Sequence, residues 1–407
     1  MTTAQTTTEA SPTAFRGASL ADAMAHLNFL QGQQYDVVVA REDISASGGR
    51  LQVKTPRGMI TVAPTSDMES QMATELEIRL SHLRSARADS ALFPLLDMPT
   101  LDGQPIDETT ARLGEAEYRY MIANRLRHGR RAHMLRLYQG PDVYTGRSFS
   151  SPSYGVFDNR DAAATVLNGL IESGLDASTT DVRMDLSDRR MVLKVNVPQI
   201  QVAAAEFLKG YRNPLSESHS GYAPGTEPIV ESGIIVTNGE TGWASLSMAP
   251  YFRIKICQNG LVITEKLAQC TYRHKGRALG VGDVPTADDT RRAFATWMGK
   301  EIRDNVAHWL TPEFMTSYID RLTAKSGREL ERPADVIGEV GKTLVWTDTE
   351  VAGIVNMFTR GGQPTSGGVL QAVTAFTQTL TSADRAWELE CQAVQAMELA
   401  YAAAGRQ

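Results

Sequence analysis

Apolar and polar residues alternate in short segments along much of the chain, and this pattern predicts β-strands. Other segments carry apolar residues at helical spacing, and turn residues such as Gly, Pro and Asn separate the two kinds. The predicted strands cover residues 35–40, 50–55, 59–62, 132–138, 181–186 and 191–197. The predicted helices cover residues 19–30, 108–127 and 161–173, a further helix is capped by Ser66, and residues 144–159 are mostly loop.

The segment from residue 233 to residue 264 has the most regular β pattern. Four strands are predicted there in close succession, over residues 233–237, 243–249, 251–257 and 261–264. Asn238-Gly239 and Asn259-Gly260 mark tight turns, because the Asn-Gly pair accepts the positive φ angles that hairpins require. We therefore expect an antiparallel meander in this part of the chain.

Beyond residue 283 the pattern is helical to the end. Thr311 precedes Pro312, a favoured first residue of a helix, and Thr347 precedes Glu350 at the spacing of a capping box. Another helix is expected to open at Thr286, and the last covers residues 383–404. The chain as a whole predicts an α+β fold with an antiparallel β-meander core, flanking helices and a helical C-terminal region.

The 407 residues suffice for two or three folding units. A disordered tail, rich in Thr, Ala and Ser, is expected over residues 1–14, followed by a small α+β unit over residues 15–107. An α+β core with the antiparallel sheet would occupy residues 108–283, and the helical region residues 284–407. Residues 213–228 are rich in Pro, Ser and Gly and predict a long loop of the functional kind.

Composition restricts the compartment. Three cysteines are too few for a disulfide framework and favour a reducing environment. No apolar segment reaches the roughly 20 residues of a membrane-spanning helix, and the N-terminus lacks the apolar segment of a signal peptide. We expect a protein of the cytoplasm that does not interact with the membrane.

Charge is distributed unevenly. The net charge is −6, yet residues 112–147 hold eight Arg against three carboxylates and residues 253–277 hold six Lys or Arg against one. Each segment therefore carries +5, which leaves −16 for the rest of the chain. A basic surface on an acidic body is typical of proteins that attract anions, although solvated arginines without a ligand would give the same count.

The strand predicted over residues 251–257 combines basic and aromatic side chains. Because side chains alternate across a strand, Tyr251, Arg253 and Lys255 would share one face, opposite Phe252. Grooves for single-stranded nucleic acid use cations to hold phosphates and aromatic rings to stack on bases. An ordinary amphipathic strand with a solvated polar face would show the same pattern.

Two further segments combine cations with tyrosines, one at residues 272–277 and one at residues 118–138. The second holds Arg125, Arg127, His128, Arg130, Arg131, His133 and Arg136, flanked by Tyr118, Tyr120 and Tyr138. Three such segments favour a nucleic-acid surface. The candidate nucleic-acid-binding residues are Tyr251, Arg253, Lys255, Tyr272, Arg273, Lys275, Arg277, Arg130 and Arg131.

No catalytic motif is evident in the sequence. It lacks Gly-x-Ser-x-Gly, His-Glu-x-x-His and the phosphate-binding Gly-Lys-Ser/Thr. Cys257, Cys270 and His274 are possible zinc ligands, but a close ligand pair and a fourth ligand are missing, and a buried cysteine is the commoner explanation. We expect no catalytic residue, no metal and no cofactor.

Several motifs resemble one known family. The segments 235–242 (IVTNGETG) and 253–261 (RIKICQNGL), the pair Arg273-His274 and the Ser-x-x-Tyr-x-x-x-Asp-Asn element at residues 151–159 resemble a phage- and plasmid-encoded family catalogued as domain of unknown function 932. The resemblance covers roughly residues 148–399. Asn-Gly-Glu stands where that family commonly has a Ser-His-Asp-Gly type of turn. The resemblance implies a mobile-element protein of a bacterial host cytoplasm and transfers no catalytic residue.

The favoured hypothesis is a phage or mobile-element protein that forms a homo-oligomer and binds single-stranded DNA or anneals it in recombination or replication. The layout of a basic meander followed by helices is similar to that of phage annealing proteins. One alternative is a host-directed inhibitor or nucleotide-processing enzyme with a pocket near residues 213–228. A structural or assembly protein is another.

Overall fold

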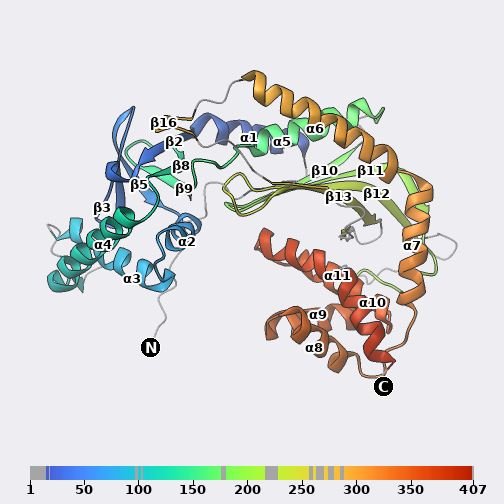
Figure 1. The fold of residues 1–407 in the computed structure, drawn as a ribbon. Helices are drawn as coiled ribbons and strands as arrows, with labels where there is room; N and C mark the ends of the chain where they lie inside the picture. The colour runs from blue at the N-terminus through green and yellow to red at the C-terminus, as the bar shows by residue number, and fades with distance from the viewer. Residues whose placement is uncertain are drawn as a thin grey trace.

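The computed structural model describes residues 15–17, 19–96, 100–101, 104–175, 180–215, 228–255, 260–262, 270–273, 279–284 and 288–405. Over these residues the protein is a mixed α/β structure built on two seven-stranded sheets, with a helical C-terminal region. We call the two sheets sheet A, which contains β10 to β13, and sheet B, which contains β2 and β8. Figure 1 shows sheet A between two groups of helices, and sheet B beside it with helices of its own. The predicted fold class is confirmed.

Sheet A is antiparallel and has the strand order β1-β10-β11-β12-β13-β14, with β15 also paired to β13. The part of the chain where the meander was predicted forms β12, β13 and β14, which pair antiparallel in this order, and the predicted hairpin β10-β11 extends the same sheet. The strands are β1 (Phe15–Gly17), β10 (Asp181–Leu186), β11 (Met191–Ala203), β12 (Ile229–Asn238), β13 (Leu246–Ile254), β14 (Gly260–Val262) and β15 (Cys270–Tyr272).

One detail of the predicted meander is wrong. Residues 243–249 and 251–257 were expected as separate strands, but β13 continues through Pro250, which lies opposite Ile234. On its other edge β13 pairs with β15 through Met248 and with β14 from Tyr251. Pro250 therefore lies where this edge changes partner, a position at which a residue without an N–H group is tolerated.

Sheet B has the order β16-β2-β8-β9-β5-β4-β3 and contains one parallel pair, β5 with β9. Its strands are β2 (Gln34–Ala40), β3 (Ile44–Ser47), β4 (Arg50–Thr55), β5 (Gly58–Pro64), β8 (Ala132–Tyr138), β9 (Tyr144–Ser150) and β16 (Gly282–Asp283). β9 corrects the loop expected at residues 144–159. A domain boundary was expected between residues 107 and 108. Strands from before and after this point pair within sheet B, β2 with β8 and β5 with β9, so the two sides belong to one unit.

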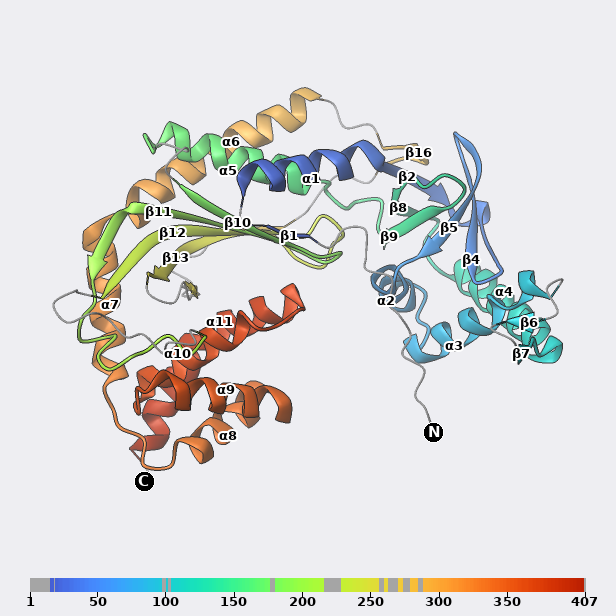
Figure 2. The ribbon, with the colours of Figure 1, turned by 180° about the vertical axis from the view of Figure 1, so that it is seen from behind.

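Three helices cover one face of sheet A: α1 (Leu20–Gln33), α5 (Asn159–Glu172) and α6 (Asp288–Trp309). Figure 2 shows them side by side above the sheet. Their buried residues, such as Leu27, Val166 and Ile302, pack against the apolar side of the meander. Ser19 caps α1 as predicted, since its hydroxyl accepts a hydrogen bond from the Asp22 N–H.

Sheet B packs against α2 (Ser66–Glu75), α3 (Leu80–Ser90) and α4 (Glu108–His128). Thr65, rather than the expected Ser66, caps α2. The helix predicted from this point is interrupted, because Glu77 adopts a positive φ of 54° and separates α2 from α3. Short elements complete this unit: η1 (Arg41–Asp43), η2 (Phe93–Leu95), β6 (Thr100–Leu101) and β7 (Gln104–Pro105).

The C-terminal region is helical as predicted, and its helices are α7 (Pro312–Ser326), α8 (Pro333–Leu344), α9 (Asp348–Gly361), α10 (Ser366–Thr377) and α11 (Ala383–Ala404). Thr311 caps α7, and Thr347 with Glu350 forms the predicted capping box of α9. The apolar faces of these five helices share one core with Phe252 and Ile254 of β13. Within the described residues, no helix combines the length and the apolarity that crossing a membrane requires.

Candidate functional site

Basic side chains gather at the C-terminal end of α4. We call this group the α4 basic surface: Arg41, Arg125, Arg127, His128, Arg130 and Arg131. The helix ends at Gly129, and the three residues from its last turn favour the negative end of the helix dipole. Arg41 reaches the same place from η1 and donates hydrogen bonds to the carbonyl oxygens of Arg127 and Gly129.

Three arginines of this surface face solvent and have no ion-pair partner in the described part of the chain. Arg125, Arg127 and Arg131 are exposed and form no ion pair with any other residue that the structure describes. Arg130 pairs with Glu75 at 2.9 Å. The surface therefore carries positive charge that the described part of the chain leaves largely uncompensated.

An exposed aromatic ring lies next to this surface. Tyr120 is 73% exposed and precedes Arg127 by seven residues, which places both on one side of α4. A solvent-facing tyrosine on the same helix face as an arginine is the combination that supports base stacking beside phosphate binding.

Leu279, which follows the second basic segment in the sequence, lies at the turn that Arg130 contacts. Arg130 donates a hydrogen bond of 3.5 Å to the Ser151 hydroxyl, and the Leu279 N–H donates one of 3.0 Å to the Pro152 carbonyl oxygen. The chain that follows the cluster at residues 272–277 therefore returns to the turn that Arg130 contacts. Of this cluster, Arg273 is exposed, whereas Lys275 and Arg277 lie outside the described residues.

Other residues expected on these surfaces are engaged inside the protein. Tyr272 is half-buried, packs edge-on against Trp297 and hydrogen-bonds to Glu301 through its hydroxyl. His133 and Arg136 of the expected third cluster are fully buried, as are the neighbouring Tyr118 and Tyr138. Both faces of β8 are covered, so the alternation of side chains along this strand does not distinguish a solvent-exposed face from a buried one.

The face of β13 expected to be wet is covered by α11, which corrects that expectation. Tyr251 is only 4% exposed and packs near Trp387 and Cys391. Arg253 is held by Glu231 at 2.8 Å and by Asp181. Lys255, just beyond the strand, is exposed. In this conformation Tyr251 offers no free ring to a base.

A buried polar cluster joins the two sheets. Arg136 of β8 contacts Asp158 at 2.5 Å and Asp36 at 2.9 Å, and donates a hydrogen bond of 2.5 Å to the carbonyl oxygen of Glu240. Arg147 pairs with the Glu240 carboxylate, whose other oxygen accepts a hydrogen bond from the backbone of Asn159. Burial lowers the pKa of Arg136, but the surrounding carboxylates outweigh it and raise the pKa well above its usual value.

Two segments of the family resemblance, residues 151–159 and residues 235–242, meet in this cluster. The Tyr154 hydroxyl donates to the Gly239 carbonyl oxygen at 2.8 Å, and the Asn238 amide donates to the Asn159 side chain at 2.9 Å. Asn238 thus ends β12 instead of forming a two-residue turn, and the positive φ of 91° falls on Gly242. These contacts use the polar groups of residues 151–159 and 238–242 for cohesion between the sheets.

Among the described residues, no group of three His, Cys, Asp or Glu side chains is placed so that it could hold a metal ion. Of the zinc ligands considered from the sequence, Cys257 and His274 lie outside those residues. Most of the loop at residues 213–228, where a pocket was considered, lies outside them too.

Comparisons with protein-family models, with curated proteins and with solved structures found no match to this chain.

Proposed function

We propose that this protein binds single-stranded nucleic acid on the α4 basic surface. The observation that supports the proposal most is the exposure of Arg125, Arg127 and Arg131 without ion-pair partners among the described residues, beside the exposed ring of Tyr120. Cations of this kind bind phosphates and release counterions, and the ring can stack on any base.

The composition of the surface favours a single strand over a duplex. A stacking tyrosine needs an unpaired base, whereas a duplex keeps its bases stacked on one another. The whole chain is acidic, with a net charge of −6. The local positive potential at α4, and not the net charge of the protein, would therefore attract the nucleic acid to this surface.

Two double variants of equal charge change test this proposal. Arg127→Gln with Arg131→Gln should reduce the salt slope of oligonucleotide binding by about 1.4, because each lost phosphate contact removes about 0.7. The control is Arg112→Gln with Arg119→Gln, on the same helix, where Arg112 pairs with Glu108 and Arg119 lies 3.9 Å from Glu115. If both double variants weaken binding equally, the attraction is general and the proposed surface is wrong.

The stacking part of the proposal has its own test. Tyr120→Ala should weaken binding by roughly 1–3 kcal/mol, while Tyr120→Phe should retain it, because stacking needs the ring and not the hydroxyl. Equal binding by all three proteins would remove Tyr120 from the site.

The wider assignment rests on the sequence. The family resemblance suggests a protein of a phage or another mobile element in the host cytoplasm. The similarity in layout to phage annealing proteins suggests that it anneals DNA as a homo-oligomer. Annealing would require two strands to be held at once, so a strand-pairing assay with complementary oligonucleotides tests this step separately from binding.

A further inference from the structure

Arg41 links the end of β2 to the end of α4. It follows β2 directly, and its backbone N–H donates a hydrogen bond of 3.0 Å to the Arg131 carbonyl oxygen, next to the last paired residues of β2 and β8. Its side chain donates hydrogen bonds to the carbonyl oxygens of Arg127 at 2.8 Å and Gly129 at 3.4 Å. One residue therefore holds three carbonyl groups of the segment from Arg127 to Arg131.

The end of α4 needs a contact of this kind, because the last four carbonyl groups of a helix have no partner within it. Gly129 ends the helix with φ −86° and ψ −158°, so it does not form the left-handed turn that commonly satisfies these groups. Its N–H turns back to the carbonyl oxygens of Arg125 and Leu126. The side chain of Arg41 satisfies the carbonyl of Arg127, and its positive charge favours the negative end of the helix dipole.

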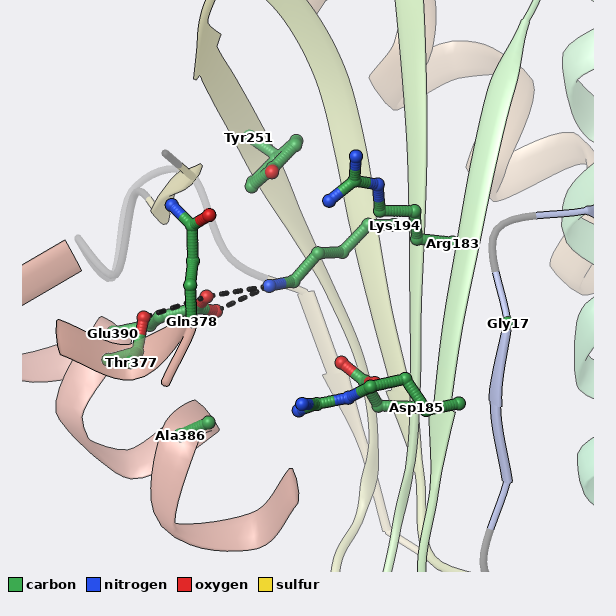
Figure 3. A pocket seen from close by; sticks show the side chains of 10 residues that line it. Gly17, Arg183, Asp185, Lys194, Tyr251, Thr377, Gln378, Ala386 and Glu390 are labelled. Atoms are coloured by element: carbon green, nitrogen blue, oxygen red, sulfur yellow. Dashed lines mark hydrogen bonds and ion pairs between the residues drawn. The ribbon is translucent and has the colours of Figure 1, made fainter. Parts of the chain in front are cut away.

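Arg41 differs from enclosed cations elsewhere in the protein. Figure 3 shows the more usual arrangement at the cavity between sheet A and the C-terminal helices, where Lys194 contacts both carboxylate oxygens of Glu390. Arg136 and Arg147 also face carboxylates. The hydrogen-bond partners of the half-buried Arg41 side chain, within the described part of the chain, are carbonyl oxygens. Its side chain therefore holds backbone and does not neutralise an acid.

The backbone that Arg41 holds belongs to the α4 basic surface. Arg127 and Arg131 contribute two of the exposed arginines of this surface, and both offer their carbonyl oxygens to Arg41. Side chains of like charge repel one another, and a loose segment would let the two guanidinium groups move apart. A segment that is already fixed before binding also loses less conformational entropy when a ligand arrives.

We propose that Arg41 is a positioning residue of the α4 basic surface. It fixes the backbone from Arg127 to Arg131 so that the side chains of these two arginines can bind phosphates together, and it is not itself a phosphate ligand. This inference rests on the proposed function, and it makes the end of β2 part of the binding surface.

Salt titrations of oligonucleotide binding distinguish a positioning residue from a phosphate ligand. Arg41→Gln should weaken binding about two- to tenfold at each salt concentration, because the segment must then be ordered on binding. It should change the logarithmic salt slope by less than about 0.3, under half of one phosphate contact. Arg131→Gln is the matched control, since it removes one positive charge from the same surface, and it should reduce the slope by about 0.7.

Hydrogen exchange of the free protein gives a second readout, which needs no nucleic acid. In Arg41→Gln the amides of the last turn of α4, residues 125–129, should exchange at least about threefold faster than in the parent protein, because this turn opens more easily. In Arg131→Gln they should exchange as in the parent protein. Arg41→Lys, which keeps the charge and a donor, should lie between the parent protein and Arg41→Gln in both affinity and exchange. Unchanged far-UV circular dichroism shows that each variant is folded.

Three outcomes would overturn the proposal. A fall of about 0.7 in the salt slope of Arg41→Gln would make Arg41 a phosphate ligand. Binding that depends on Arg127 and Arg131 but is unchanged in Arg41→Gln, with unchanged exchange, would remove Arg41 from the site and leave the proposed function in place. Absence of oligonucleotide binding by the parent protein would overturn the proposed function and this inference together.

Discussion

Lys194 Nζ lies 2.7 Å from both carboxylate oxygens of Glu390, although 196 residues separate the two in the sequence. Lys194 belongs to the polar face of sheet A, and Glu390 to α11. The apolar contact beside this ion pair is small and centres on Tyr251 and Trp387. The position of α11 over the sheet therefore depends on matched charges as well as on apolar burial.

Breaking this pair from one side should be costly. Glu390→Leu leaves the Lys194 ammonium without its partner in a site that is mostly closed to water, and we expect a loss of about 3 kcal/mol in the free energy of unfolding. Urea denaturation monitored by tryptophan fluorescence measures it. The double variant Lys194→Met with Glu390→Leu should recover most of the loss, and a double variant as unstable as the single one would contradict this role.

The Arg136 cluster should be the most sensitive point of the contact between the sheets. Arg136→Gln leaves Asp36 and Asp158 buried without their cation, and the expected cost is about 3–5 kcal/mol. Arg112→Gln also removes an arginine from an ion pair, but an exposed one, and should cost less than about 1 kcal/mol. Chemical denaturation measures the free energy of unfolding of both variants. Similar losses in the two would show that the buried cluster stabilises the protein no more than an exposed ion pair does.

His133 should make stability depend on pH. Burial and the nearby charge of Arg130 lower its pKa to about 4, and the ring stacks on Phe149 with neither nitrogen hydrogen-bonded to another described residue. Between that pKa and the unfolded value of about 6.5, the unfolded chain binds the extra proton. The free energy of unfolding should therefore fall by about 3 kcal/mol as pH falls through this range.

The variant His133→Leu should lose this part of the pH dependence and remain more stable than the parent protein near pH 4. His128→Leu, which removes an exposed histidine, should keep it. Denaturant titrations of the parent protein and both variants between about pH 4 and pH 6.5 measure this pH dependence of the free energy of unfolding. An unchanged pH profile in His133→Leu would show that another group is responsible.

Local signals predicted much of the fold. β4, β8 and β10 have the bounds that alternation indicates, and α11 has the bounds that its spacing indicates. Thr347 and Glu350 form the expected capping box because the motif depends only on neighbouring residues. The pairing of β5 with β9 was not predicted, since it joins strands about 80 residues apart and depends on tertiary packing.

The candidate site could be predicted only in part for the same reason. Arg130 and Arg131 are exposed as expected, since they follow a helix end. Tyr251 and Arg253 show the same kind of basic and aromatic pattern, yet α11 and distant carboxylates cover them. Charged residues on a strand predict a polar face, but only the three-dimensional arrangement shows whether water or another part of the chain satisfies it.

The central claim is that the α4 basic surface binds single-stranded nucleic acid, and fluorescence anisotropy with a labelled single-stranded oligonucleotide, titrated over a range of salt concentrations, tests it most directly. We predict saturable binding at low salt, with a logarithmic salt slope of about −2 to −3.5, as expected for three to five phosphate contacts. Absence of binding at low salt, or binding that does not change with salt, would contradict the claim.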